Sequence, residues 1–548
     1  MKSKSLNALR LAMLVACLGG FALSANADTP HPGPDHPGAK IYQKLCVDCH
    51  AENGEGVDGK ADDPLYGNRD IPSLAGRIER TMPEDHEDLC VGEDARAVAE
   101  YIYDAFYSVE ARARNTPARI DLTRLTVPQY RNSLADLIGN FRGGYGNPVP
   151  KERGLNAHYY GSRNHSAKKE NNGKDKFEQV DSTLRFDFGE GTPKLPEGKE
   201  FPKEEFSIRW DGMILTEETG DYEFVIRTRN GVMLWVNERE DQESKTIDGW
   251  VAPNNEKREI SGKTFLLGRR AYPIRLDFFK YKEKAAAVEL LWKPPHGTLE
   301  PVPTRNLVPG WCHESFVVST PFPADDRSVG YERGTAVSRA WLDAVTAGAI
   351  EAADYVGDHL DQLAGTKQDD PKREEKIRNF ARRFTEIAFR RPLSAEEQAH
   401  FVDQRFEQGK STEQRIRRLV LLTLTSPRFL YPGYSPSEEV DDFDVASRLA
   451  LALWDSLPDQ RLFEQARKGE LSQPQQIEST ARRMLDDARS RAKMRGFFHH
   501  WLELDRANDL DKDSKVFSEF NETVLADLRS SLFLFLDDIV WSEKSDYR

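Results

Sequence analysis

Residues 46–50 read Cys46-Val47-Asp48-Cys49-His50. Two cysteines three positions apart, followed directly by a histidine, form the pattern of covalent haem attachment, in which the thiols bond to the porphyrin and the histidine binds the iron. Because positions i and i+3 share one face of a helix, both sulfurs reach the same edge of the ring. The stretch therefore predicts a domain with one haem c attached to Cys46 and Cys49, and with His50 as an axial ligand.

Two other interpretations of this motif are a zinc half-site and a redox-active dithiol. Zinc requires further ligands at a matching spacing, and the sequence offers only scattered candidates such as Cys90. Haem attachment is the interpretation that uses both cysteines and the histidine together.

Length and charge restrict the class of protein. A chain of 548 residues and 62.4 kDa is too long for one hydrophobic core, so several domains are expected. Hydrophobic residues make up 38% and charged residues 31%, which is typical of globular domains rather than of a membrane bundle. The 77 basic and 91 acidic residues give a net charge of -14, so a nucleic-acid partner is not expected.

Residues 1–27 have the pattern of a signal peptide. Basic residues precede an apolar run at 11–23, and Ala25-Asn26-Ala27 supplies the small-x-small pattern before a cleavage site at Asp28. Lipidation of Cys17 is the less favoured alternative, because few apolar residues precede it. Residues 28–39 are rich in Pro, Gly and His and are expected to form a flexible leader. No later segment has the roughly 18 apolar residues of a membrane span, so we expect an exported protein, periplasmic or at the cell surface, without a transmembrane segment after cleavage.

Residues 40–110 carry further motifs around the haem site: a turn at 72–76, the loop Thr81-Met82-Pro83, and a helix from residue 94 to about 106 with apolar side chains at helical spacing. On these motifs the segment resembles the all-α class I c-type cytochromes. The resemblance implies Met82 as the second axial ligand, and His86 is a rival close by. Ligation by His and Met leaves no open iron position and suits electron transfer better than oxygen chemistry.

Cys90 and Cys312 remain after the haem pair and Cys17 are assigned. In an oxidising compartment they could form a disulfide between the haem domain and the rest of the chain. Two separate buried thiols are an equally good alternative, because sequence does not give the distance between their Cα atoms.

Residues 111–152 predict a short helical bridge, and residues 153–309 change to a period of two. Tyr222, Phe224 and Ile226 alternate with other residues, and Asn230-Gly231 predicts a hairpin turn. Similar alternation recurs at 272–278 and 288–292. The pattern predicts an all-β sandwich with two layers of inward apolar side chains.

Three short motifs lie along this segment: Arg209-Trp210-Asp211-Gly212, Leu234-Trp235-Val236 and Ile247-Asp248-Gly249-Trp250. On these the segment resembles the protective-antigen-type β-sandwich. In its sugar-binding members paired acidic residues hold calcium, and here Asn230-Gly231 stands at the matching turn, so calcium is a doubtful cofactor. The resemblance implies possible glycan contacts at Trp210, Asn230, Asp248 and Trp250; a purely structural or protein-docking module is the alternative.

Residues 310–335 are expected to be a linker, followed by helical domains at 336–435 and 436–548 with apolar stripes at helical spacing. Ser394 and Glu397 predict a capping box. Stretches at 389–398, 421–432 and 447–471 resemble uncharacterised helical domains of large secreted planctomycete-type cytochromes. These relatives continue further, so we expect residues 436–548 to be a shortened domain.

The sequence thus predicts a multidomain fold: an all-α cytochrome c domain, an all-β sandwich and an all-α helical region. The favoured function is electron transfer to a redox partner protein by an exported monohaem cytochrome whose β-sandwich docks it to a protein partner or to a polysaccharide or cell-surface glycan. A haem-dependent enzyme oxidising carbohydrate or peroxide, and an adhesin or scaffold, are the alternatives. The sequence has no hydrolase, zinc-protease or phosphate-loop motif, so no catalytic residue is assigned.

Overall fold

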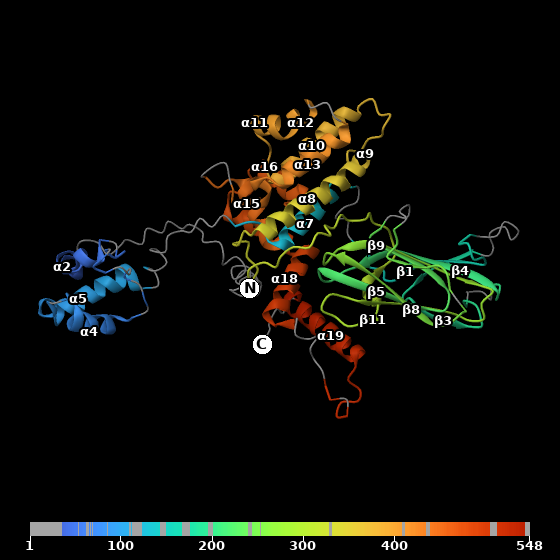
Figure 1. Ribbon diagram of the computed structural model, residues 1–548, viewed down its shortest axis with the longest axis horizontal. Helices are drawn as coiled ribbons and strands as arrows, with labels where there is room; N and C mark the ends of the chain where they lie inside the picture. The colour runs from blue at the N-terminus through green and yellow to red at the C-terminus, as the bar shows by residue number, and fades with distance from the viewer. Residues whose placement is uncertain are drawn as a thin grey trace, which may run out of the picture. The chain divides into compact units, whose positions relative to one another are not determined.

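The computed structural model describes residues 36–542 apart from short gaps, and the chain divides into two compact units, whose described parts are 36–111 and 123–542 (Figure 1). The predicted signal peptide lies outside the described residues. The gaps are residues 53, 58, 62–64, 66, 68, 85, 109–110, 112–122, 143–148, 167–175, 195–200, 239–243, 253, 328–330, 408–410, 435–438, 505–511 and 514.

The first unit is helical. Its elements are α2 (Pro37–Leu45), α3 (Val47–His50), α4 (Ile71–Thr81), η1 (Glu87–Leu89), α5 (Glu93–Ile102) and η2 (Tyr103–Tyr107). α2 and α4 both pack on α5. The apolar side chains predicted to share one face of the closing helix are all buried in the core of this unit, namely Val98, Tyr101, Ile102, Ala105 and Phe106.

Residues 72–76 do not form the predicted turn, because they belong to α4. Asp70 caps this helix by accepting a hydrogen bond from the N–H of Ser73 at 3.0 Å. Pro72 stands in the first turn, where its missing N–H is not needed. The same proline that suggested a turn therefore helps to start a helix.

The second unit contains the sandwich, which is built from two antiparallel sheets. The seven-stranded sheet has the order β2-β1-β4-β9-β6-β7 with β12 beside β4, and the five-stranded sheet has the order β11-β10-β5-β8 with β3 beside β10. The strands are β1 (Leu155–Tyr160), β2 (Lys176–Asp181), β3 (Arg185–Gly189), β4 (Glu205–Leu215), β5 (Gly220–Thr228), β6 (Gly231–Val236), β7 (Ile247–Gly249), β8 (Arg258–Leu266), β9 (Ala271–Tyr281), β10 (Ala286–Lys293), β11 (Glu300–Pro301) and β12 (Leu307–Val308).

Asn230-Gly231 does not form the predicted hairpin, because β5 and β6 lie in different sheets and the chain crosses between the layers here. Gly231 lies so close to Phe279 that an added Cβ atom would come within 1.9 Å of its ring. The amide of Asn230 donates to the carbonyl of Ala285 and accepts from the N–H of Ala287, each at 3.1 Å. Position 231 therefore requires glycine, because any larger side chain would overlap the ring of Phe279.

The first helical core of this unit contains α7 as well as the helices that follow the sandwich. Its elements are α7 (Val127–Gly139), α8 (Arg339–Asp358), α9 (Leu360–Leu363), α10 (Arg373–Phe389), α11 (Ala395–Glu397), η6 (Gln398–Asp403), α12 (Gln404–Glu407), α13 (Thr412–Leu424) and α14 (Pro427–Leu430). The predicted capping box of Ser394 and Glu397 is present. Tyr130 of α7 and Phe316, from the expected linker, are both buried in this core. The sandwich is therefore an insertion between two parts of one helical core.

A buried ion pair closes this insertion: Arg124, before α7, lies 2.8 Å from Asp325, after the last strand. The N–H of Leu125 also donates to the carbonyl of Leu430 at 2.8 Å. Both links join chain segments about 200 or more residues apart to the same core.

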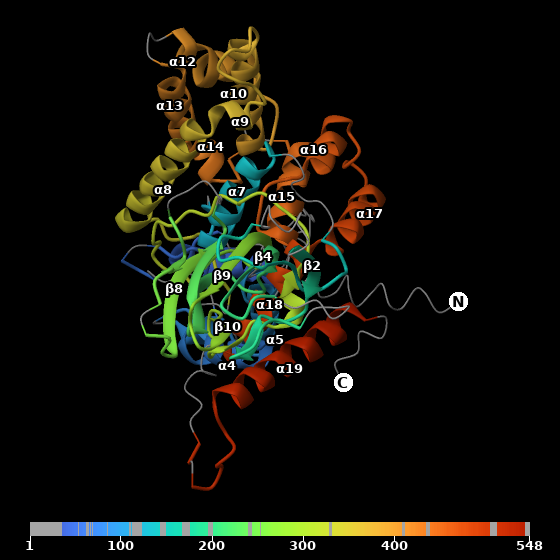
Figure 2. The ribbon, with the colours of Figure 1, turned by 90° about the vertical axis from the view of Figure 1, so that its right-hand side faces the viewer.

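A second helical cluster follows, consisting of α15 (Asp442–Trp454), α16 (Gln460–Arg467), α17 (Pro474–Leu485), α18 (Ala488–Trp501) and α19 (Glu522–Trp541). Figure 2 shows α19 running below the sandwich, and it contacts β11. Arg495 of α18 pairs with Glu217 of the β4–β5 turn, and Arg529 of α19 donates to the carbonyl of Pro295 at 2.7 Å. The sandwich is thus fixed to the helical region by charged side chains.

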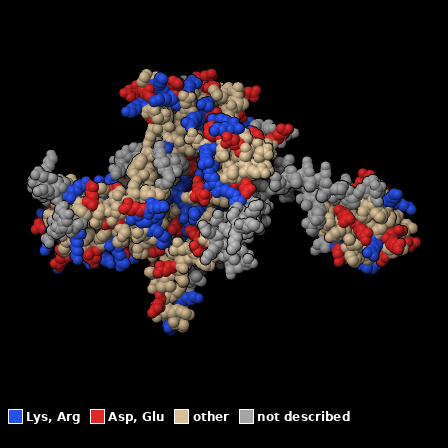
Figure 3. Space-filling model, turned by 180° about the vertical axis from the view of Figure 1, so that it is seen from behind, with Lys and Arg blue, Asp and Glu red and all other residues tan. Residues whose placement is uncertain are grey.

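The predicted fold class is confirmed: a helical N-terminal region, a β-sandwich and a helical C-terminal region. Among the described residues no helix has the length and apolar character required to cross a membrane. Lys and Arg lie side by side with Asp and Glu on the face drawn in Figure 3.

Candidate functional site

The haem-attachment motif consists of Cys46, which directly follows α2, and the single helical turn α3. The N–H groups of Cys49 and His50 both donate to the carbonyl of Cys46, at 3.2 and 2.9 Å. The hydroxyl of the buried Tyr42 donates to the carbonyl of Ala51 at 2.8 Å and fixes the end of this turn. The two thiols and the imidazole are therefore presented from one short, internally hydrogen-bonded segment.

Burial shifts the pKa of the Cys46 thiol and the pKa of the His50 imidazole in opposite directions. Burial, and to a lesser extent Cys90 and Cys49, raise the pKa of the half-buried Cys46 thiol to about 12. Burial and Arg77 lower the pKa of His50, so its imidazole is neutral near pH 7. Its Nδ1 is buried and has no hydrogen-bond partner in the described part of the chain. A neutral imidazole is the form that binds a metal.

The two alternative interpretations of the motif find no support in this geometry. A redox dithiol requires a thiol with a lowered pKa, whereas the pKa of Cys46 is raised. A zinc site requires about four ligands, and no group of three His, Cys, Asp or Glu residues suited to a metal occurs within the described ranges.

Met82 directly follows α4, and its N–H donates to the carbonyl of Ile78 at 2.9 Å. Its side chain is partly buried against the core of the first unit, as is Cys46. The rival His86 is exposed. Of the two candidate ligands, Met82 is therefore the one whose side chain lies against the core of this unit.

The described cysteines are free thiols, including Cys90 and Cys312. Cys90 is buried in the core of the first unit, and Cys312 is half-buried in the second. Burial raises the pKa of the Cys312 thiol to about 12. The free thiols agree with the alternative of two separate buried cysteines, while a disulfide between the two units stays a prediction.

Two of the four proposed glycan contacts are core residues of the sandwich. Trp210 is fully buried, and its Nε1 donates to Asp181 at 2.7 Å. Asn230 is also fully buried, and its amide is used within the crossing between the sheets. Neither side chain presents a surface to a sugar in this structure, so these two predictions are corrected.

Asp248 and Trp250 lie near the surface. Asp248 is exposed, accepts a hydrogen bond from the N–H of Trp250 at 3.2 Å and pairs with Lys245 at 3.1 Å. The half-buried Trp250 packs on Phe279, with 4.4 Å between ring centroids. Packing on one side holds this indole in place and leaves part of it accessible.

The side chain of Arg258, the first residue of β8, reaches Asn230-Gly231, where the sugar-binding members of the resembled family have paired acidic residues. The guanidinium of Arg258 donates to the carbonyls of Gly249 at 2.6 Å, Val251 at 2.6 Å and Asn230 at 3.1 Å. Calcium needs six to eight oxygen ligands, and a protein cation already uses the oxygens here. The geometry therefore argues against calcium at this turn.

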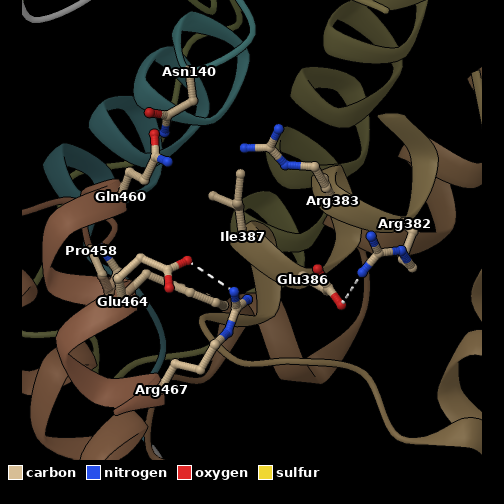
Figure 4. Close-up of a pocket in the computed structure, with 10 residues that line it drawn as sticks. Asn140, Arg382, Arg383, Glu386, Ile387, Pro458, Gln460, Glu464 and Arg467 are labelled. Atoms are coloured by element: carbon tan, nitrogen blue, oxygen red, sulfur yellow. Dashed lines mark hydrogen bonds and ion pairs between the residues drawn. The ribbon is translucent and has the colours of Figure 1, made fainter. Parts of the chain in front are cut away.

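The structure also contains a cavity that no sequence motif predicts. It has a volume of about 300 Å³ and lies where α7, α10 and α16 meet (Figure 4). Its residues come from positions near 140, 383 and 460, and none belongs to a recognisable motif. Only the tertiary fold brings these positions together.

Three parts of the chain match family models. Residues 33–102 match "Cytochrome C oxidase, cbb3-type, subunit III", residues 151–305 match "PA14 domain", and residues 440–548 match "Protein of unknown function (DUF1592)". The chain therefore contains a cytochrome c domain and a PA14 domain, followed by a C-terminal region of the third family. The first match implies covalent haem c.

Known proteins resemble part of the chain. Anti-sigma-I factor RsgI3 of Acetivibrio thermocellus is 32% identical over 164 residues, which cover 29% of this chain and 22% of that protein. An anti-sigma factor domain-containing protein from Clostridium clariflavum is 27% identical, with a TM-score of 0.25, and the match covers 31% of this chain and 51% of that one. The PA14 domain of the MpAFP antifreeze protein is 14% identical, with a TM-score of 0.23, over 30% of this chain and 96% of that one. The chain spans about a fifth of the curated relative and about half of the anti-sigma factor structure.

Proposed function

We propose that this protein is an exported c-type cytochrome that carries electrons, with one haem c attached to Cys46 and Cys49 and with His50 and Met82 as axial ligands. The observation that carries the proposal is the helical turn that presents both cysteines together with a neutral, half-buried His50, whose buried Nδ1 has no partner in the described structure. The cytochrome match over residues 33–102 supports the same cofactor.

Bound haem supplies a one-electron couple, Fe(III)/Fe(II). Cys46, Cys49, His50 and Met82 would hold that group, and the attachment turn is itself fixed, since Tyr42 donates to the carbonyl of Ala51 at 2.8 Å and Lys60 donates to the carbonyl of Asp48 at 3.1 Å. Ligation by both His50 and Met82 would exclude a substrate from the iron. This arrangement suits electron transfer, and it disfavours the alternative of an oxidising enzyme.

The sandwich is proposed to dock the protein to a glycan or to a protein partner, such as the redox partner. The PA14 match and the accessible indole of Trp250 support a glycan. The order of the three family matches supports the resemblance to large secreted planctomycete-type cytochromes. Export to the periplasm or the cell surface fits both the haem domain and the PA14 domain.

The test is absorption spectroscopy of the exported full chain, oxidised and reduced, with a check that haem remains attached after denaturation. We expect a six-coordinate, low-spin spectrum and little binding of carbon monoxide to the reduced protein. Met82→Ala should open the iron and admit carbon monoxide, while the matched variant His86→Ala should behave as wild type. A five-coordinate spectrum of the wild type, or a change of ligation in His86→Ala alone, would overturn the assignment.

A further inference from the structure

A lysine is buried at one end of the sandwich core. Lys280, near the end of β9, is only 1% exposed, although lysine is almost never fully buried unless it is paired. Its Nζ lies 3.5 Å from the carbonyl oxygen of Lys284, and it forms no ion pair with a described residue. Neither haem attachment nor glycan binding uses this amine.

The register of the sheet brings Asn230 next to Lys280. The antiparallel strands β6 and β9 pair Val232 with Phe278, and both of these side chains are buried in the core. Two positions further along the same register, Asn230 lies opposite Lys280, and both are buried as well. Side chains in such a pair have Cβ atoms about 4.5–5.5 Å apart, a gap that the four-carbon stem of lysine can bridge.

A carboxyl group contacts the same amide. The Nδ2 of Asn230 donates to Glu283, in the turn between β9 and β10, and to the carbonyl of Ala285 at 3.1 Å. The N–H of Ala287 donates to Oδ1 of Asn230 at 3.1 Å. Since Ala285 directly follows the residue whose carbonyl the amine of Lys280 approaches, the amine, the amide and the carboxyl meet at one end of the core.

Burial shifts the protonation of both ionisable groups toward their uncharged forms. It lowers the pKa of the Lys280 amine and raises the pKa of the Glu283 carboxyl, and the attraction between the two groups opposes each shift without reversing it. An uncharged amine is a nucleophile, and a protonated carboxyl can donate a proton. These are the forms that amide exchange requires.

We propose that an intramolecular amide bond joins Nζ of Lys280 to Cγ of Asn230, and that the protein forms this bond itself with Glu283 as the proton carrier. The lone pair of Nζ attacks Cγ, and the N–H of Ala287 stabilises the negative charge that develops on Oδ1. Glu283 gives its proton to Nδ2 and takes one from the attacking nitrogen. The bond between Cγ and Nδ2 then breaks, and ammonia leaves.

The reaction exchanges one amide for another, so it needs no oxidant, metal or co-reactant. Its product ties β9 covalently to the point where the chain crosses between the two sheets. A cross-link of this kind restricts the unfolded chain and so stabilises the sandwich.

Intact-mass spectrometry of the denatured, haem-loaded full chain tests the proposal. We expect a wild-type mass that is lower by one molecule of ammonia than the mass of the chain with its haem, and a tryptic digest in which Asn230 and Lys280 share one branched peptide. Lys280→Met and Glu283→Gln should each retain the ammonia, after allowance for the substitution itself. Circular dichroism checks that both variants are folded.

The matched control is Glu256→Gln, which makes the same chemical change at an exposed glutamate before β8 and should keep the cross-link. A folded wild type that retains its full mass would overturn the proposal. Loss of ammonia confined to the peptide that carries Asn230 would also overturn it, because that product is cyclisation onto the backbone nitrogen of Gly231. A cross-link that still forms in Glu283→Gln would refute the role of Glu283.

Discussion

The α-carbon of Gly38 in α2 faces the backbone carbonyl oxygen of Ala97 in α5: a Cβ atom added to Gly38 would lie 2.1 Å from that oxygen. It would also lie 2.8 Å from the Cβ of Tyr101. The two helices therefore cross with their backbones in direct contact. Since α2 leads directly into the haem-attachment turn, this crossing holds Cys46 against the closing helix.

Replacing Gly38 by alanine should destabilise the first unit by about 1–3 kcal/mol, because backbone atoms cannot move aside as a flexible side chain can. Thermal unfolding followed by haem absorbance measures the change. The control is Gly76→Ala in α4, where the nearest atom is the flexible end of Arg80 at 3.2 Å. This variant should be as stable as wild type or up to about 1 kcal/mol more stable, through helix propensity. Equal stability of Gly38→Ala and wild type would contradict the contact.

Local signals in the sequence predicted much of the structure. The haem motif, the apolar face of α5 and the Ser394 capping box each depend on residues within one or two helical turns. At residues 72–76 two local signals conflict: Pro72 and Gly76 favour a turn, whereas Asp70 before the proline is the start signal of a helix, and the helix forms.

What the sequence did not reveal depends on pairing between distant segments. Asn230-Gly231 has the composition of a hairpin, yet the next strand pairs in the other sheet, and that choice is made by β9 and β10. Trp210 carried no sign of which face of β4 turns inward. The insertion of the sandwich and the cavity at Arg383 likewise arise only when remote helices pack together.

The accessible indole of Trp250 predicts a glycan contact on the sandwich. Trp250→Ala should weaken binding to any glycan that the wild type recognises by about tenfold, the size expected for loss of an aromatic contact. Glycan-array screening followed by titration of the best ligand measures this. Trp311 is 72% exposed and lies beyond the last strand, so Trp311→Ala is the matched control. Glycan binding that survives Trp250→Ala would exclude this contact.

The guanidinium of Arg258 predicts that calcium does not stabilise the sandwich. A ligand that binds only the folded state raises its melting temperature, and the rise grows with the logarithm of the ligand concentration divided by the dissociation constant. Because Arg258 already binds the carbonyls of Gly249 and Asn230, millimolar calcium and EDTA should give the same melting temperature, as measured by scanning calorimetry. A rise with calcium that EDTA reverses would show that a site exists despite this arginine.

Glu217 links the sandwich to the C-terminal helices and should make their attachment sensitive to acid. Burial raises the pKa of its carboxyl, but the charges of Arg495, Arg269 and Arg305 lower the pKa by more than burial raises it. The net result is a pKa of about 2. Arg495 also donates to Asp537 of α19 at 2.9 Å. Because the folded pKa lies below the ordinary glutamate value of about 4.3, this contribution is fully present above that pH and is lost as the pH falls toward 2.

The measurement is the difference in free energy of unfolding between wild type and Glu217→Gln from pH 6 to pH 2. We expect wild type to be more stable by up to about 3 kcal/mol near pH 6, and we expect the gap to close between about pH 4.5 and 2. Glu396→Gln makes the same chemical change at an exposed glutamate of α11 with no ion pair among the described residues, so its gap should stay near zero. A gap for Glu217→Gln that does not change with pH would mean that packing, and not the charge on Glu217, holds the sandwich to α18.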